Sequence, residues 1–205
     1  MKTLISQAAE AKIYKEGNNI VKDRISKGYR HPVLDKKIIK QRTRREASIL
    51  EKAHKLINSP LPSEVTENQI KMPFIEGKKL SEHLEQLNWK EICKQIGKNI
   101  AILHDNDIIH GDLTTSNMIW QYKREVVSKK PQGVLHFIDF GLSFHSKRFE
   151  DKAVDLHLIK QALEAKHFSI HKEAEQIILD NYNSKDKTKI LEQLKKVEAR
   201  GRYKH

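Results

Sequence analysis

The spacing of apolar residues divides the chain into a strand-rich start and a helix-rich remainder. Alternating apolar and polar residues at 11–14 and 19–22, separated by Glu16-Gly17-Asn18, are typical of a β-hairpin. From Leu34 to Asn58 the apolar residues recur mostly three or four positions apart, which predicts one long helix. The next segment is restricted to strands and turns by Pro60, Pro62 and Pro73.

Helical spacing governs most of the second half. The segment Ser81 to Gln86 predicts a short helix with Ser81 as its cap, and Trp89 to Asp105 predicts a longer helix with one apolar face. Two short apolar strands follow at 117–120 and 134–138. The charged stretch that joins them, residues 123–133, is expected to form an exposed hairpin tip.

Residues 151–200 predict three further helices, so the sheet-rich part of the chain is concentrated before Gly77. We therefore expect an α+β fold with two lobes. Residues 1–76 would form a sheet with one long helix, and residues 77–205 a helical lobe with a basic tail. A cleft between two such lobes is a natural ligand site.

Composition narrows the class of protein. Of the 205 residues, 38% are hydrophobic and 32% are charged, against roughly 45–50% and 25% in an average domain. No apolar run reaches the roughly 18 residues needed to cross a bilayer, and no signal peptide is recognised. The single cysteine, Cys93, excludes an internal disulfide framework. We expect a soluble protein with no membrane partner, cytoplasmic, or nuclear if the source is eukaryotic.

The net charge of +12 comes from two segments. Between Lys22 and Arg45 there are ten basic and two acidic residues, and between Lys195 and His205 there are five basic and one acidic. Concentrated positive charge attracts polyanions and is the electrostatic footprint of nucleic-acid binding. A solvated helix face gives the same composition, so charge alone leaves both interpretations open.

Two short motifs next to the strands of the second half carry candidate chemistry. They are His110-Gly111-Asp112-Leu113-Thr114-Thr115-Ser116-Asn117 and Ile138-Asp139-Phe140-Gly141. Phosphoryl transfer needs a carboxylate at the attacking hydroxyl and two oxygen ligands for a magnesium ion that bridges phosphates. Asp112 suits the first task, and Asn117 and Asp139 suit the second. Lys22, in an alternating strand, could hold phosphate, with Glu46 of the long helix as its partner.

This ordered set of five residues resembles that of the eukaryotic-type protein kinase fold. More narrowly, the chain resembles, over nearly its whole length, the PRPK-type atypical serine/threonine kinase/ATPase family of the KEOPS (EKC) complex. The resemblance is carried by Ala8-Ala9-Glu10-Ala11, Val21-Lys22-Asp23-Arg24, residues 27–35, residues 42–47, the loop 110–118, Asp139-Phe140-Gly141-Leu142 and Arg200-Gly201-Arg202.

The resemblance implies a reduced, bilobal protein-kinase-like fold that binds ATP and Mg²⁺. Lys22 would bind the α- and β-phosphates beside Glu46, Asp112 would accept the proton, and Asn117 and Asp139 would bind the metal. The segment Met72 to Glu76 would be the hinge and would offer backbone groups to adenine, and residues 6–11 would replace a glycine-rich loop. The nucleotide-binding residues implied in this way are Ser6, Gln7, Ala8, Ala9, Glu10, Ala11, Met72, Phe74 and Glu76.

Membership of that family would also imply a role in the threonylcarbamoyl-adenosine modification of tRNA. The partners would be the KEOPS threonylcarbamoyl-transferase subunit and other KEOPS subunits. The two basic clusters would then contact tRNA phosphate, and the tail would contribute Arg200, Arg202 and Lys204.

Four features depart from an ordinary protein kinase. No Gly-x-Gly-x-x-Gly precedes Lys22, Thr114 stands where protein kinases carry a lysine, Gly111 replaces an arginine, and no Ala-Pro-Glu follows Gly141. These departures favour ATP hydrolysis over protein phosphorylation. Two alternatives stay open: a small-molecule phosphotransferase of the aminoglycoside or choline type, and a non-catalytic scaffold that binds nucleotide and tRNA.

Overall fold

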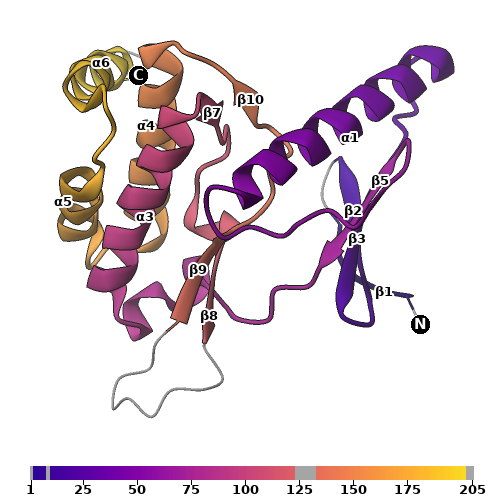
Figure 1. The fold of residues 1–205 in the computed structure, drawn as a ribbon, viewed down its shortest axis with the longest axis horizontal. Helices are drawn as coiled ribbons and strands as arrows, with labels where there is room; N and C mark the ends of the chain where they lie inside the picture. The colour runs from indigo at the N-terminus through magenta and orange to yellow at the C-terminus, as the bar shows by residue number, and fades with distance from the viewer. Residues whose placement is uncertain (1, 8–9, 123–132, 202–205) are drawn as a thin grey trace.

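A sheet-rich half and a helical half lie side by side in the computed structural model (Figure 1). The structure describes residues 2–7, 10–122 and 133–201. Ala8, Ala9, residues 123–132 of the expected hairpin tip, and the tail residues Arg202 and Lys204 lie outside the described residues.

The N-terminal half contains a five-stranded antiparallel sheet in the order β1-β2-β3-β5-β4. Its strands are β1 (Lys2–Gln7), β2 (Ala11–Glu16), β3 (Asn19–Arg24), β4 (Glu64–Val65) and β5 (Gln69–Pro73). The predicted hairpin is confirmed as β2 and β3. Strand β1 was not predicted, because all six of its residues are exposed and alternation of buried positions is absent.

Helix α1 (Pro32–His54) is the predicted long helix, with its bounds shifted toward the N-terminus. It begins at Pro32 because proline suits the first helical turn, where its missing N–H is not needed. Its buried positions include Ala47, Leu50 and Ala53. In Figure 1 its first turns project away from the helical half, whereas its last turn lies beside β10, where Lys52 Nζ is 3.1 Å from His145 Nε2.

The C-terminal half is built on four longer helices: α3 (Trp89–Asp105), α4 (Phe149–Lys166), α5 (His171–Asn181) and α6 (Lys187–Gly201). The predicted bounds of α3 are confirmed. Helix α2 (Leu80–His83) continues into a 3₁₀ turn, Leu84–Gln86. The predicted Ser81 cap is wrong: the cap position is Lys79, because strand β6 (Lys78–Lys79) runs directly into the helix.

Short strands support the two chemical motifs. Strand β8 (Met118–Tyr122) pairs with β9 (Gly133–Phe137) and with β6, and β7 (Ile108–Ile109) pairs with β10 (Phe144–His145). A 3₁₀ turn, Thr115–Asn117, precedes β8. Because β7 ends just before His110 and β9 just before Ile138, both motifs leave the ends of strands and are held close to the same place.

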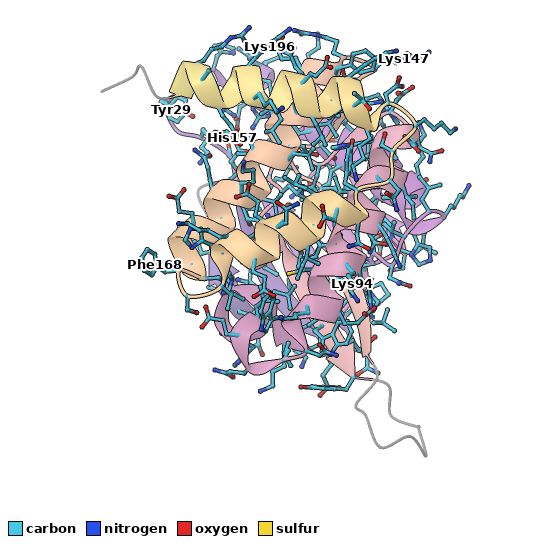
Figure 2. The ribbon with its side chains drawn as sticks, turned by 90° about the vertical axis from the view of Figure 1, so that its left-hand side faces the viewer. Tyr29, Lys94, Lys147, His157, Phe168 and Lys196 are labelled. Carbon is cyan, nitrogen blue, oxygen red and sulfur yellow. The ribbon has the colours of Figure 1, made fainter. Side chains whose placement is uncertain are left out.

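One apolar core runs through both halves, since buried residues of α1, β5, α3 and β9 belong to a single cluster. Figure 2 looks onto the helical half, where α5 and α6 form the outer layer and Phe168, 81% exposed, projects from the turn between α4 and α5. Across the described ranges, every helix is too short or too polar to traverse a bilayer.

Candidate active site

A cavity of about 300 Å³ lies between the two halves. Lys22 and Glu46 reach it from the N-terminal half, and Asn117 and Asp139 from the C-terminal half. Its other walls are mostly apolar and include Ile20, Leu50, Met72, Phe74, Ile119 and Ile138. Ligand pockets typically combine an apolar wall with a few convergent polar groups, and this cavity has that character.

Three charged side chains meet at the polar end of the cavity. Lys22 Nζ is 2.7 Å from Glu46 Oε1 and 2.6 Å from Asp139 Oδ1. The Lys22 and Glu46 side chains are 10% and 1% exposed, whereas the Asp139 side chain is 47% exposed. The predicted lysine–glutamate pair is therefore present, and the accessible member of the triple is Asp139.

The charges of this triple stabilise one another. Burial lowers the pKa of the Lys22 ammonium, but the two carboxylates outweigh it and the pKa lies above its ordinary value. Burial raises the pKa of the Asp139 carboxyl, but Lys22 and the Gly141 N–H outweigh it and hold that pKa below its ordinary value. Both groups are therefore charged at neutral pH.

The backbone of Asp139 is in the left-handed region, with φ of 59°. A non-glycine residue there costs of order 1 kcal/mol or more and persists where the surroundings impose it. The Gly141 N–H donates to Asp139 Oδ1 at 3.1 Å, and Lys22 contacts the same oxygen. The strained backbone thus aims the carboxylate at Lys22 and the cavity.

Asn117 lines the other side of the cavity and contacts Asp112, which is not itself among the lining residues. Asn117 Nδ2 donates to Asp112 Oδ2 at 2.8 Å and to the Asp112 carbonyl oxygen at 2.9 Å. With the amide nitrogen used in this way, Asn117 Oδ1 remains available as a ligand. A carboxylate and an amide oxygen are the hard donors that Mg²⁺ prefers, so Asp139 and Asn117 fit such an ion.

Asp155 of α4 holds the loop that carries Asp112. Its carboxylate, 1% exposed, accepts the His110 N–H at 2.7 Å and the Gly111 N–H at 2.8 Å. Gly111 has φ of +78°, and a Cβ there would lie 2.4 Å from the Leu142 carbonyl oxygen, so only glycine fits. His110 Nε2 is 3.2 Å from the Ile138 carbonyl oxygen, which joins the two motifs.

Several residues predicted to bind nucleotide do not line the cavity. Ser6, Met72 and Phe74 do, whereas Gln7, Glu10, Ala11 and Glu76 are not among the lining residues. The Glu10 carboxylate instead contacts Arg42 at 2.5 Å and Arg24 at 3.5 Å. The implied positions Ala8 and Ala9 are outside the described residues.

Sequence reasoning missed two residues that hold the site. Arg24 donates to Glu46 Oε2 at 2.5 Å. The sequence could have indicated this contact, because residues two apart on a strand share a face and Lys22 was already predicted to face Glu46. Asp155 had no comparable signal, because an acid on a helix is ordinary until the loop it contacts is known.

Comparison with known proteins places these observations in a family. A model of the RIO domain matches residues 5–140 of the chain. The chain is 41% identical to KEOPS complex subunit Bud32 of Pyrococcus abyssi, over 98% of this chain and 96% of that protein. It is 40% identical to EKC/KEOPS complex subunit bud32 of Dictyostelium discoideum, over 98% of this chain and 83% of that protein.

A probable bifunctional tRNA threonylcarbamoyladenosine biosynthesis protein of Methanobrevibacter smithii is 40% identical over 98% of this chain, which spans 37% of that protein. A solved structure of the Rio2 kinase–ADP/Mg²⁺–phosphoaspartate complex from Chaetomium thermophilum superimposes with a TM-score of 0.66 at 13% identity, over 97% of this chain and 72% of that one. This confirms the predicted protein-kinase-like α+β fold. The chain belongs to the RIO-domain family of atypical kinases and, within it, to the Bud32 group of KEOPS subunits.

Proposed function

We propose that this protein is a Mg-ATP-dependent phosphotransferase of the atypical serine/threonine kinase type that works mainly as an ATPase. The proposal rests on one observation. Lys22 Nζ lies within 2.7 Å of both Glu46 Oε1 and Asp139 Oδ1, at one end of a cavity that Asn117 also lines. A cavity with an apolar wall and this polar end suits a nucleotide, with adenine against the wall and the phosphates at the lysine.

Each residue has a defined task in this proposal. Lys22 binds the α- and β-phosphates, and Glu46 holds its ammonium in place. Asn117 and Asp139 hold Mg²⁺, which supplies charge neutralisation at the phosphate oxygens when bound. Asp112, kept in place by Asn117, orients the attacking hydroxyl or water and accepts its proton. Backbone groups near Met72 and Phe74 bind adenine.

The segment after Gly141 supports hydrolysis over phosphorylation of a protein. Residues 142–148 lead directly into α4. They are fixed by β10, by the Ser146 N–H, which donates to the Asp107 carbonyl oxygen at 2.9 Å, and by Ser146 Oγ, which donates to Asp151 Oδ2 at 2.5 Å. Little chain is left to bind a peptide substrate, so water is the acceptor that this site accommodates best. A small-molecule acceptor would need a larger helical half.

The relatives' names extend the proposal to a complex and a pathway. They are named as KEOPS subunits or as a tRNA threonylcarbamoyladenosine biosynthesis protein. We propose that this chain likewise acts in a KEOPS complex on tRNA, beside the threonylcarbamoyl-transferase subunit. This role places it in the cytoplasm, or in the nucleus of a eukaryotic cell.

Ion pairs within the chain favour some basic side chains over others for a contact with tRNA phosphate. Six of the ten basic residues between Lys22 and Arg45 form such ion pairs: Lys22, Arg24, Arg30, Lys36, Lys40 and Arg42. Lys37, Arg44 and Arg45 are exposed on α1, and Lys195 and Lys196 on α6, where Lys196 points outward (Figure 2). We propose that these exposed residues, with the tail, carry the tRNA contact, for which Arg200 would have to leave its 2.6 Å ion pair with Glu150.

Measuring phosphate release from ATP tests the catalytic proposal. Asp139→Ala and Lys22→Ala are expected to lower turnover by at least about 100-fold while leaving the fold intact. Lys98→Gln, which removes an exposed cation from α3, serves as the control and should keep full turnover. Full turnover by either site variant would refute the proposal. ATP binding without phosphate release, even with tRNA and KEOPS subunits, would favour the scaffold alternative.

A salt titration tests the tRNA contact separately. Deletion of residues 200–205 is expected to weaken tRNA binding and to lower the dependence of the affinity on salt, because fewer counterions are released. An unchanged affinity and an unchanged salt slope would contradict this part of the proposal alone.

A further inference from the structure

Arg24 forms a second ion pair with Glu46, the partner of Lys22. It lies two residues after Lys22 on β3, so both side chains leave the same face of the strand toward α1. Glu46 is shared between them: Oε1 contacts Lys22 Nζ at 2.7 Å, and Oε2 contacts Arg24 Nη2 at 2.5 Å. The Arg24 side chain is 5% exposed, so this contact is made almost without water.

The charges at this point balance only when Arg24 is counted. Two cations, Lys22 and Arg24, face two carboxylates, Glu46 and Asp139. Without Arg24 this group, which is buried except for Asp139, would carry one net negative charge. A negative charge at the phosphate end of the cavity would repel a nucleotide, and low polarity around it would strengthen the repulsion.

Arg24 is also held from its other side. The carboxylate of Glu10, the residue before β2, is 3.5 Å from Arg24 Nη1 and 2.5 Å from Arg42 Nη1, and the Glu10 carbonyl oxygen accepts the Ile25 N–H at 3.1 Å. The hydrogen bond from Arg42 and, to a smaller extent, the charge of Arg24 outweigh burial and hold the pKa of the Glu10 carboxyl below its ordinary value. The residue before β2, together with β3 and α1, therefore fixes the guanidinium against Glu46.

One donor of Arg24 has no hydrogen-bond partner among the residues that the structure describes. Its Nε is buried and makes no hydrogen bond to any part of the chain that the structure describes. An unsatisfied buried donor is costly. A residue that only filled space here would avoid this cost, so the cost points to a need for the positive charge itself.

We infer that Arg24 is a positioning residue for nucleotide phosphates. It holds Glu46 Oε2 so that Oε1 faces Lys22, and its charge keeps the buried group neutral, which leaves Lys22 able to attract phosphate. The inference rests on the proposed nucleotide-binding function. It assigns to Arg24 an effect on the phosphates and none on adenine.

The test compares the affinities for ATP and adenosine by calorimetry on the full chain. Arg24→Gln is expected to weaken ATP binding about tenfold and to leave adenosine binding unchanged, because only ATP carries the phosphate charge. Arg24→Lys keeps the cation and is expected to stay within about threefold of the wild type. Arg148→Gln, which removes an arginine from an exposed ion pair with Glu150, is the control.

Two outcomes would overturn the inference. One is an unchanged ratio of ATP to adenosine affinity in Arg24→Gln, and the other is an equal loss in Arg24→Lys. The Lys22→Ala variant separates this inference from the proposed function. If Lys22→Ala changes the ratio and Arg24→Gln does not, only the inference fails; if neither does, the proposed phosphate site fails as well.

A charge-balanced variant covers the case in which Arg24→Gln does not fold. The double variant Arg24→Gln/Glu46→Gln removes one cation and one anion from the buried group. It is compared with Glu46→Gln alone, which retains the Arg24 charge. The inference predicts that Glu46→Gln binds ATP more tightly than the double variant, while both bind adenosine equally. Equal ATP affinity of the two would refute it.

Discussion

Asp155 offers a direct test of how the loop before Asp112 is held. Its two carboxylate oxygens accept two different backbone donors, the N–H groups of His110 and Gly111, at 2.7 and 2.8 Å. Replacement by asparagine leaves one acceptor and turns an NH₂ group toward the other N–H. Replacement by alanine leaves both donors buried without an acceptor.

Asp155 Oδ2 also lies 3.3 Å from His104 Nε2, and the expected size of the effect is worked from the two shorter backbone bonds alone. A hydrogen bond to a charged group contributes about 1.5–3 kcal/mol to stability, and a buried orphaned donor costs a similar amount. We therefore expect Asp155→Asn to lower the free energy of unfolding by about 2 kcal/mol, and Asp155→Ala by roughly 3–6 kcal/mol. The larger loss is a substantial part of the roughly 5–15 kcal/mol that stabilises a typical domain.

Urea unfolding followed by circular dichroism measures both losses, with Asp180→Asn on the exposed face of α5 as the matched control. The control is expected to change stability by less than about 0.5 kcal/mol. Turnover of ATP by Asp155→Asn should also fall, because the loop positions Asp112. If Asp155→Asn is as stable as the control, the two hydrogen bonds do not hold the loop and the reasoning is wrong.

Three further measurements address other parts of the molecule. Tyr182→Phe removes the hydroxyl 2.8 Å from the buried His104 Nδ1 and should cost about 1–3 kcal/mol in the same unfolding assay. Burial lowers the pKa of His167, whose Nε2 lies 3.2 Å from Thr115 Oγ1. The unfolded chain therefore takes up the proton first, so stability should fall as the pH drops through about 6.5, and a His167→Gln variant should show a weaker pH dependence. Burial raises the pKa of Cys93 to about 12, so a thiol reagent should label it only after urea unfolds the chain; rapid labelling of the native protein would contradict the buried position.

Local patterns predicted the elements whose buried face is regular. Helix α3 has its predicted bounds because Ile92, Ile96, Ile100 and Leu103 lie on one face and all are buried. The β2–β3 hairpin follows from alternation around Gly17. Strand β1 could not be found in this way, because its residues are exposed and its place is set by pairing with β2.

The site was predictable where a residue type is tied to its chemistry. Lys22, Glu46, Asn117 and Asp139 could be named because phosphoryl transfer needs those groups in that order, and the fold brings them to one cavity. The outward position of Glu10 was not predictable. The Glu10 carboxylate is held by Arg42 of α1, and only the tertiary packing brings these two residues together.

The backbone contact at Gly77 fixes the place where the chain enters the helical half. A Cβ there would lie 2.4 Å from the Trp120 carbonyl oxygen, so the Gly77 backbone packs directly against β8. Strand β6 begins at the next residue and pairs with β8, so the chain belongs to the helical half from this point. In the sheet-rich half, the Phe74 N–H donates a hydrogen bond to the Asn18 carbonyl oxygen at 2.9 Å. Ile75 and Glu76 lie between these two backbone contacts. This segment runs directly beside the Phe74 wall of the cavity, so a base stacked on that wall would lie next to the stretch of chain that joins the two halves.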